Sequence, residues 1–169
     1  MKNKTYVVFD IETTGFSAGM HRITEIGAIK IENGVITGEF HQLIDPEVPI
    51  LRRITEITGI TDDFLAGQPT IGDALPLFIN FCCECTLVAH NASFDMSFIK
   101  ANAREQGLKC NFSVIDTLSM ARRLFPRLEN HKLNTVAKHL NIKHKNHHRA
   151  MGDAHATAQI FLRCMELCK

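Results

Sequence analysis

Residues 5–15 read TYVVFDIETTG, a β-branched and aromatic run that ends in two carboxylates and a glycine. The nearly continuous apolar character of Thr5–Asp10 predicts a strand that is buried on both faces. Asp10 and Glu12 lie two residues apart where this strand ends, so both carboxylates point to one face of it. Open α/β sheets bind ligands at this end of their strands. A strand that turns polar as it leaves the core would also carry such a pair.

The segment that follows predicts a β-hairpin. Two β-branched runs, Ile23–Ile31 and Val35–Ile44, flank the dipeptide Asn33-Gly34. Asn-Gly accepts the positive φ angles of a tight turn and is a strong hairpin signal between such runs. The chain therefore opens with three antiparallel strands.

Helices and short strands alternate in the rest of the chain. Two further buried strands are predicted at Thr86–Ala89 and Phe112–Asp116. Apolar periodicity, caps and stops predict helices at residues 51–58, 70–83, 93–106, 118–124, 133–140 and 152–167. Pro76 is expected to kink the second helix or to delay its start.

This order of elements predicts an α/β fold. The expected sheet is mixed and five-stranded, with an antiparallel three-strand meander and two parallel strands, and it is flanked by helices. Residues 1–169 are predicted to form a single domain, since no linker or repeat divides the sequence.

The composition narrows the class of protein. The 169 residues are 45% hydrophobic and 22% charged, which is typical of a globular domain and excludes a collagen, a coiled coil or a wholly disordered chain. No apolar run is long enough to cross a membrane, and Tyr6–Phe9 is too short for the core of a signal peptide. We therefore expect a cytoplasmic protein without a membrane anchor.

Charge is unevenly distributed, although the net charge is only +1. Residues 1–98 carry 13 acidic and 6 basic side chains, whereas residues 99–169 carry 5 and 13. Residues 121–149 hold eight Lys or Arg and a single acid, Glu129. This basic stretch predicts the face that approaches a nucleic-acid backbone. A merely solvated pair of helices would show a similar pattern.

Two clusters could instead hold zinc. The cysteine-rich stretch lacks a second C-x-x-C pair, so we predict free thiols at Cys82, Cys83, Cys85, Cys110, Cys164 and Cys168. Cys164 and Cys168 lie four residues apart on a helical pattern and are expected to face the core. A histidine cluster offers an alternative transition-metal site within a basic run that has no ordered ligand spacing: His144, His147 and His148.

Two further acids occupy positions like those of the first pair. Asp95 follows a buried strand and opens a helix, where Asn91 or Ser93 could cap the helix and Asp95 would suit its positive end. Asp153 lies near the start of the last helix, and His148 can approach it only from the preceding loop. Four acids at the ends of separate elements are typical of a site for hard divalent cations.

Three motifs together resemble a known family. FDIETTG (residues 9–15), HNASFD (90–95) and HRAMGD (148–153) are similar, in order and spacing, to the three motifs of the DEDDh 3′–5′ exonucleases. The resemblance covers nearly the whole chain. Within that superfamily it is closest to the proofreading exonucleases of bacterial DNA polymerase III, either the epsilon-type subunit or the domain embedded in the Gram-positive-type polymerase. The segment ITGIT (57–61) also resembles those proteins.

The resemblance implies a ribonuclease H-like fold and two divalent cations, Mg²⁺ or Mn²⁺. By the family pattern, Asp10, Glu12 and Asp153 hold the first cation. Asp10 bridges to the second, and Asp95 lies near it through water. His148 is the implied general base, which takes a proton from the attacking water. A histidine titrates near neutral pH and suits this task.

The resemblance also implies a nucleotide-binding loop after Glu12. The residues implied to flank the cations and the terminal nucleotide are Ile11, Thr13, Thr14, Phe16, His90, Asn91 and Phe94. Phe16 is our candidate for a wedge against the terminal base, and simple packing over the loop is the alternative. Thr58 stands where some epsilon-type proteins have a histidine that faces the nucleotide.

These motifs predict an exonuclease that releases nucleoside monophosphates from the 3′ end of DNA, preferably single-stranded, in proofreading or repair. The alternatives are an exoribonuclease acting on short RNA 3′ ends, a non-catalytic nucleic-acid-binding module with the same fold, and a zinc-binding interaction protein. The partner that the family suggests is a replicative polymerase. No Gly/Ser/Pro/Gln-rich tether follows the last predicted helix, so we expect a free-standing nuclease.

Overall fold

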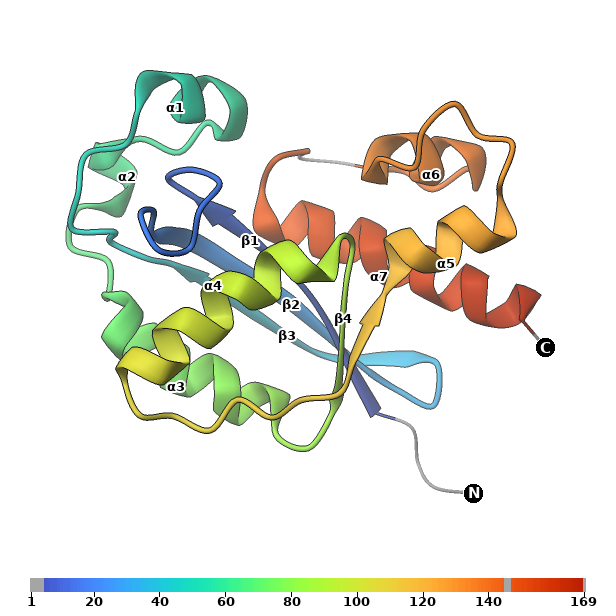
Figure 1. Ribbon diagram of the computed structural model, residues 1–169, viewed down its shortest axis with the longest axis horizontal. Coiled ribbons are helices and arrows are strands. Elements are labelled where there is room, and N and C mark those ends of the chain that lie inside the picture. Colours follow the sequence, from blue (N-terminus) through green and yellow to red (C-terminus); the bar gives the residue numbers. More distant parts are fainter. Residues whose placement is uncertain (1–4, 145–146, 169) are drawn as a thin grey trace.

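The computed structural model describes residues 5–144 and 147–168. Five strands form one sheet in the order β3-β2-β1-β4-β5 (Figure 1). The strands β1 to β3 pair antiparallel, whereas β4 pairs parallel with both β1 and β5. Their bounds are β1 Thr5–Thr13, β2 Ile23–Glu32, β3 Val35–Leu43, β4 Thr86–Ala89 and β5 Val114–Asp116. The predicted mixed five-stranded sheet is therefore confirmed.

The β2–β3 hairpin turns at the predicted dipeptide. Asn33 and Gly34 both have positive φ angles, 52° and 84°, as a tight turn between twisted antiparallel strands requires. The pairing of β1 with β2 places Glu12 opposite Glu25, and its register shifts between Glu12 and Thr13. This irregularity lies at the end of β1, where the sequence changes from apolar to acidic.

Seven helices are described: α1 Arg52–Thr58, α2 Asp62–Leu65, α3 Ile71–Cys82, α4 Ala92–Glu105, α5 Thr117–Leu124, α6 Leu133–His139 and α7 Ala150–Leu167. The helices α3 and α4 cover one face of the sheet, and α7 covers the other, with α5 and α6 packed against it (Figure 1). None of the described helices has the length and apolar character needed to cross a membrane.

Alternating residues of β1 supply both halves of the core. Phe9 points toward α3, where its ring lies 5.4 Å from that of Phe78, and both side chains are fully buried. Val8 points to the opposite face and belongs to the cluster that contains Phe161 of α7. Truncating a buried phenylalanine such as Phe78 to alanine removes about 3–5 kcal/mol of stability. Helices therefore pack on both faces of β1.

Most predicted element bounds agree with the structure to within one or two residues. Thr70 and Asp73 form the predicted capping box of α3. The helix runs through Pro76 and begins at Ile71, so the proline does not delay its start. The short helix α2 was not predicted. Its four residues are too few to show an apolar period.

The cysteines are free thiols, as predicted. The expectation that Cys168 faces the core is wrong, because Cys168 is exposed, whereas Cys164 is buried. Helix α7 ends at Leu167, and its last residues, Glu166 and Leu167, are exposed like Cys168. The thiol of Cys168 lies 3.8 Å from Nη2 of Arg123 instead.

Candidate active site

Three carboxylates from two distant segments meet at one end of the sheet. Asp10 and Glu12 lie near the C-terminal end of β1, and Asp153 lies in the first turn of α7. One carboxylate oxygen from each residue lies within 4.8 Å of the others, an arrangement that could hold a metal ion. The structure thus brings together three of the four predicted acidic ligands.

Close packing of α7 on the sheet brings Asp153 to this position. A Cβ atom on Gly27 of β2 would lie 2.5 Å from the carbonyl carbon of Ala150 and from the backbone nitrogen of Met151. Only a residue without a side chain allows the first turn of α7 to approach the strand this closely. Gly27 is paired with Asp10 in the sheet, so the contact lies beside the carboxylates.

Asp95 lies at the edge of this cluster. It belongs to the first turn of α4 and is only 3% exposed. Its Oδ1 accepts a hydrogen bond of 3.3 Å from the backbone N–H of Ile11, the residue between Asp10 and Glu12. The fourth predicted acid is thus adjacent to the other three.

Ionising the carboxylates of this cluster is unfavourable without a nearby positive charge. Burial raises the pKa of Glu12 to about 8, and the Asp153 and Glu25 carboxylates add to the effect. Burial, followed by repulsion from Asp95 and Asp153, raises the pKa of Asp10 well above its usual range. Burial raises the pKa of Asp95 to about 8. Carboxylates in this situation ionise readily only beside a cation.

The donor set fits a hard cation. The side chains that converge offer carboxylate oxygens, which Mg²⁺ and Mn²⁺ prefer as ligands. The burial and raised pKa values of Asp10, Glu12 and Asp95 favour binding of positive charge, whether protons or metal ions. The residues present therefore fit the divalent cations that the motifs imply.

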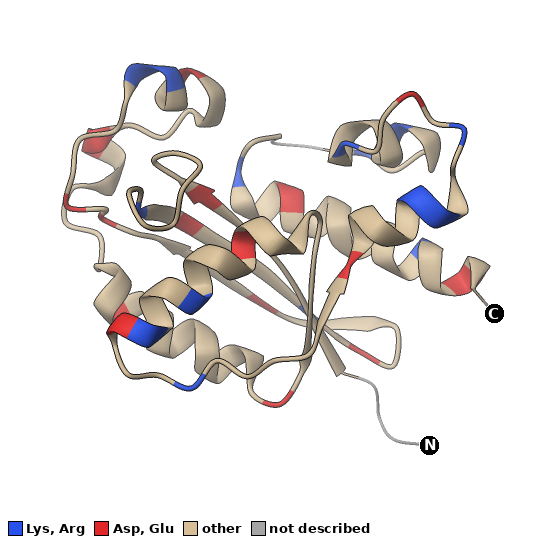
Figure 2. Ribbon diagram, in the orientation of Figure 1, with Lys and Arg blue, Asp and Glu red and all other residues tan. Residues whose placement is uncertain are grey.

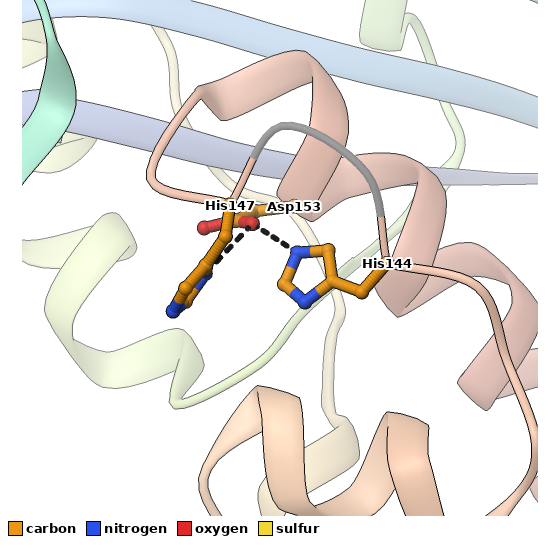
Figure 3. Close-up of side chains that lie close together, drawn as sticks. All are labelled: His144, His147 and Asp153. Carbon is orange, nitrogen blue, oxygen red and sulfur yellow. Dashed lines mark hydrogen bonds and ion pairs between the residues drawn. The ribbon is translucent and has the colours of Figure 1, made fainter.

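Two histidines contact Asp153 from the segment before α7. Nε2 of His144 contacts Oδ1 of Asp153, and Nδ1 of His147 lies 3.6 Å from the same oxygen (Figure 3). Both rings also contact the side-chain amide of Asn134. With Asp153 they form a second group that could hold a metal ion. Sequence reasoning placed His144 only in the alternative transition-metal cluster.

The ring of His148, the predicted base, contacts the ring of His147 rather than the Asp153 carboxylate. Its ring stacks on that of His147 with centroids 3.7 Å apart, and its backbone has a positive φ of 60°. Burial and the neighbouring His147 lower the pKa of His148, so its ring is neutral at neutral pH and can accept a proton. Among the described residues, His144 and His147 are the histidines in contact with the Asp153 carboxylate.

The loop after Glu12 is shaped by its own hydrogen bonds. The Thr13 hydroxyl donates to the carbonyl of Gly15 at 2.6 Å, and the Thr14 hydroxyl accepts from the N–H of Arg22 at 3.0 Å. These threonines and Ile11 are buried. The Phe16 side chain is 77% exposed, which argues against the alternative that it packs over the loop.

Most of the other residues predicted to contact the nucleotide form hydrogen bonds or packing contacts within the protein. The His90 ring contacts the Thr117 hydroxyl at 2.9 Å and the carbonyl of His131 at 2.8 Å. The Thr58 hydroxyl donates to the carbonyl of Ile54. The Phe94 ring packs against the Phe98 ring, with their centroids 5.2 Å apart. Among these residues, Asn91 is exposed and adopts a left-handed conformation with a φ of 68°.

Two acids near the site were missed by sequence reasoning. Oδ1 of Asp116 accepts the backbone N–H groups of Asn91 and Leu118, at 2.9 and 3.0 Å. Asp116 therefore holds the N-terminal end of α4 in place. The side chain of Asn91, a predicted cap, makes no capping hydrogen bond. Glu25 is fully buried between β3 and the start of α7. The sequence signal for Glu25 was a charge inside the apolar run ITEIGAIKI.

Comparisons with known proteins agree with this geometry. The PolC-type DNA polymerase III of Clostridium perfringens is 52% identical over 155 residues, and that of Bacillus subtilis is 41% identical over 168 residues. These matches cover 92% and 98% of this chain but only 11% and 12% of those relatives. The chain thus spans about a ninth of the length of the curated relatives it matches.

Solved structures share the fold. Exonuclease X in complex with 5′ overhanging duplex DNA is 28% identical, with a TM-score of 0.80, and the match covers 96% of this chain and 92% of that one. Exonuclease I is 18% identical with a TM-score of 0.84 over 97% of this chain and 43% of that one, which confirms the predicted ribonuclease H-like fold. The exonuclease family model matches residues 7–161. The chain therefore belongs to the exonuclease family.

Proposed function

We propose that this chain is a metal-dependent 3′–5′ exonuclease that hydrolyses the terminal phosphodiester bond of DNA. The observation that carries the proposal is the convergence of Asp10, Glu12 and Asp153 within 4.8 Å in a chain of the exonuclease family. Each turnover adds water across the bond between the terminal phosphate and the preceding 3′ oxygen. The products are a nucleoside 5′-monophosphate and a DNA strand with a free 3′ hydroxyl.

The acidic cluster is proposed to hold two divalent cations, Mg²⁺ or Mn²⁺. Asp10, Glu12 and Asp153 would hold the first, and Asp10 with nearby Asp95 would serve the second. When bound, such cations lower the pKa of the attacking water and stabilise charge on the phosphate and leaving oxygen. Glu12 and Asp95 would then be ionised at neutral pH, despite the pKa values of about 8 that burial gives them.

His148 is proposed to take the proton of the attacking water. Its lowered pKa leaves a neutral ring at neutral pH, which is the state a general base requires. It stacks on His147, and Nδ1 of His147 lies 3.6 Å from Asp153. This stacking supports a role for His148 next to the carboxylate cluster, and His144 and His147 are proposed to hold Asp153.

Nucleic acid is proposed to approach across the basic stretch. Lys and Arg residues occur along α5, α6 and the entry to α7 (Figure 2). Lys145, which belongs to the same run, lies outside the described residues. Phe16, which is exposed in the loop after Glu12, is the proposed wedge against the terminal base, because stacking on an aromatic ring tolerates any base.

DNA is the proposed substrate class, in proofreading or repair. The sequence relatives are PolC-type DNA polymerase III chains, and Exonuclease X, 28% identical, is described in complex with DNA. We propose that residues 1–169 form a single exonuclease domain. A polymerase is the partner that these relatives suggest, and single-stranded 3′ ends are the preferred substrate because their bases need no unpairing.

A product ladder tests the activity, its polarity and its sugar preference together. Single-stranded DNA and RNA, each labelled at the 5′ end or the 3′ end, are incubated with Mg²⁺, Mn²⁺ or EDTA. We expect a stepwise ladder from 5′-labelled DNA, immediate release of labelled mononucleotide from 3′-labelled DNA, and no reaction in EDTA. A stronger reaction on RNA would favour the exoribonuclease, and no cleavage of either would favour a non-catalytic binding module.

A further inference from the structure

Glu25 is a fully buried acid, and each of its two carboxylate oxygens has two hydrogen-bond partners. Its Oε2 accepts from Nε of Arg149 at 3.0 Å and from the backbone N–H of Ala150 at 3.0 Å. Its Oε1 accepts from Nη2 of Arg149 at 2.9 Å, and Nε2 of His41 lies 2.7 Å from the same oxygen. Burial alone would raise the pKa of Glu25, but these bonds outweigh it and lower the pKa.

The pair joins two parts of the molecule that build the site. Glu25 lies on β2 directly opposite Glu12 of β1. Arg149 follows His148 and is the residue before α7, which carries Asp153. The two partners are 124 residues apart in sequence, so the contact fixes tertiary structure rather than local structure.

We propose that Glu25 and Arg149 are positioning residues, which hold the His148 loop and the start of α7 at the correct place over Asp10 and Glu12. The inference rests on the proposed exonuclease function. It assigns neither residue a contact with substrate. Together with the close approach at Gly27, the pair sets both the distance and the rotation of α7 relative to the acidic end of β1.

The chemistry of arginine explains why this pair suits the task. A planar guanidinium that bonds a carboxylate through two parallel N–H groups fixes orientation as well as distance, which a lysine ammonium does not. The positive charge of Arg149 also lowers the pKa of Glu12, so it offsets part of the repulsion in the acidic cluster. Residues that orient metal ligands in this way typically change metal affinity 10–100-fold when they are altered.

Two other roles predict different results. A phosphate contact by Arg149 would raise KM in Arg149 variants and leave Glu25 variants unaffected. A purely stabilising role would lower the melting temperature without changing kcat in the protein that remains folded. A positioning role predicts the same kcat loss from either partner, with KM nearly unchanged, because displaced catalytic groups lose rate rather than ground-state binding.

The test uses Arg149→Lys, Glu25→Gln and the double variant, with Arg163→Lys from the exposed Arg163–Glu166 pair as the matched control. The measurements are the melting temperature, kcat and KM on single-stranded DNA, and the Mn²⁺ dissociation constant from calorimetry. We expect kcat to fall roughly 10–100-fold in each single variant and Mn²⁺ binding to weaken roughly tenfold. The double variant should lose no more than either single variant, because both remove one interaction.

Unchanged kcat and Mn²⁺ binding in folded Arg149→Lys would overturn the positioning role, as would a KM increase confined to the Arg149 variants. If Glu25→Gln fails to fold, Arg149→Lys, whose side chain reaches the surface, gives the answer alone. An inactive wild type would count against the exonuclease function. Mn²⁺ binding would then still show whether the pair orders the acidic cluster.

Discussion

Asp95 accepts a hydrogen bond of 3.3 Å from the backbone N–H of Ile11, across 84 residues of sequence. Ile11 lies between Asp10 and Glu12, so this bond connects the start of α4 to the two carboxylates of β1. Asp95 is nearly fully buried and its pKa is raised to about 8 by burial. The acid is therefore held in place by the fold at a position where its charge is unfavourable without a cation.

Asp95→Asn should separate these two effects. Asparagine keeps the oxygen that accepts from Ile11 and removes the charge. We expect activity with Mg²⁺ to fall by two or more orders of magnitude, since the proposed second cation would lose its nearby acid. The melting temperature in EDTA at pH 8 should rise, by roughly 2–4 °C per kcal/mol of repulsion relieved. A lower melting temperature in EDTA would contradict the electrostatic account.

The metal-free protein should become less stable as the pH rises toward 8. Burial raises the folded-state pKa of Glu12 and of Asp95 to about 8, above their ordinary values. The stability that these protonated groups contribute is fully present below about pH 4 and is lost as the pH rises through the folded-state pKa. Glu25 acts in the opposite direction, because its lowered pKa gives stability that is lost only in acid.

Thermal melts in EDTA at pH 7, 7.5 and 8 should therefore show a falling melting temperature, and saturating Mg²⁺ should flatten the trend. The range starts at pH 7 because the lowered pKa values of His90 and His148 add stability only as the pH rises toward their ordinary value of 6.5. Asp63→Asn, an exposed acid on α2, is a matched control that should follow the wild type. A melting temperature in EDTA that rises over this range would contradict the raised pKa values.

The three histidines before α7 should contribute unequally to the rate. His148→Ala is expected to lower kcat roughly 10²–10⁴-fold, as for loss of a general base, and higher pH should partly restore the rate. His144→Ala and His147→Ala should lower it less, since their rings hold Asp153. Steady-state rates from pH 6 to 9 provide the measurement. A larger loss in either of the latter variants would assign the base to that ring.

Phe16→Ala should weaken substrate binding without affecting stability. Stacking of one base on an aromatic ring contributes about 1–3 kcal/mol, so KM for single-stranded DNA should rise roughly 5–150-fold. Met20→Ala is the matched control. Met20 lies in the same loop as Phe16, between β1 and β2, and both side chains are 77% exposed. Equal effects of the two substitutions on KM would show that the loop, rather than the Phe16 ring, governs binding.

The elements that sequence reasoning recovered are those with strong local signals. The apolar run of β1, the Asn-Gly turn and the capping box of Thr70 and Asp73 are each confirmed. The convergence of Asp10, Glu12 and Asp153 agrees with their predicted places at the end of one strand and the start of the last helix. Their spacing, together with the motif containing Asp95, carried the resemblance to an exonuclease.

What was missed depends on contacts between distant residues. The partners of Glu25 are Arg149 and His41, on other elements, and a single sequence does not indicate which buried acid meets which base. The contact between His144 and Asp153 likewise joins a residue outside the helix to one inside it, and residue type alone does not indicate such a pairing. The hydrogen bonds of Thr58 within its own helix turn could not be told from a nucleotide contact by residue type.

The most direct test of the central claim is the exonuclease rate of Asp153→Asn beside the wild type and Asp63→Asn. Asp153 belongs to the carboxylate group that could hold the catalytic cation, whereas Asp63 is an exposed acid outside it. Release of mononucleotide from 3′-labelled single-stranded DNA is measured with saturating Mg²⁺. We predict a loss of several orders of magnitude in Asp153→Asn, with Asp63→Asn matching the wild type. An Asp153→Asn rate within tenfold of the wild type would contradict the proposed metal-dependent mechanism.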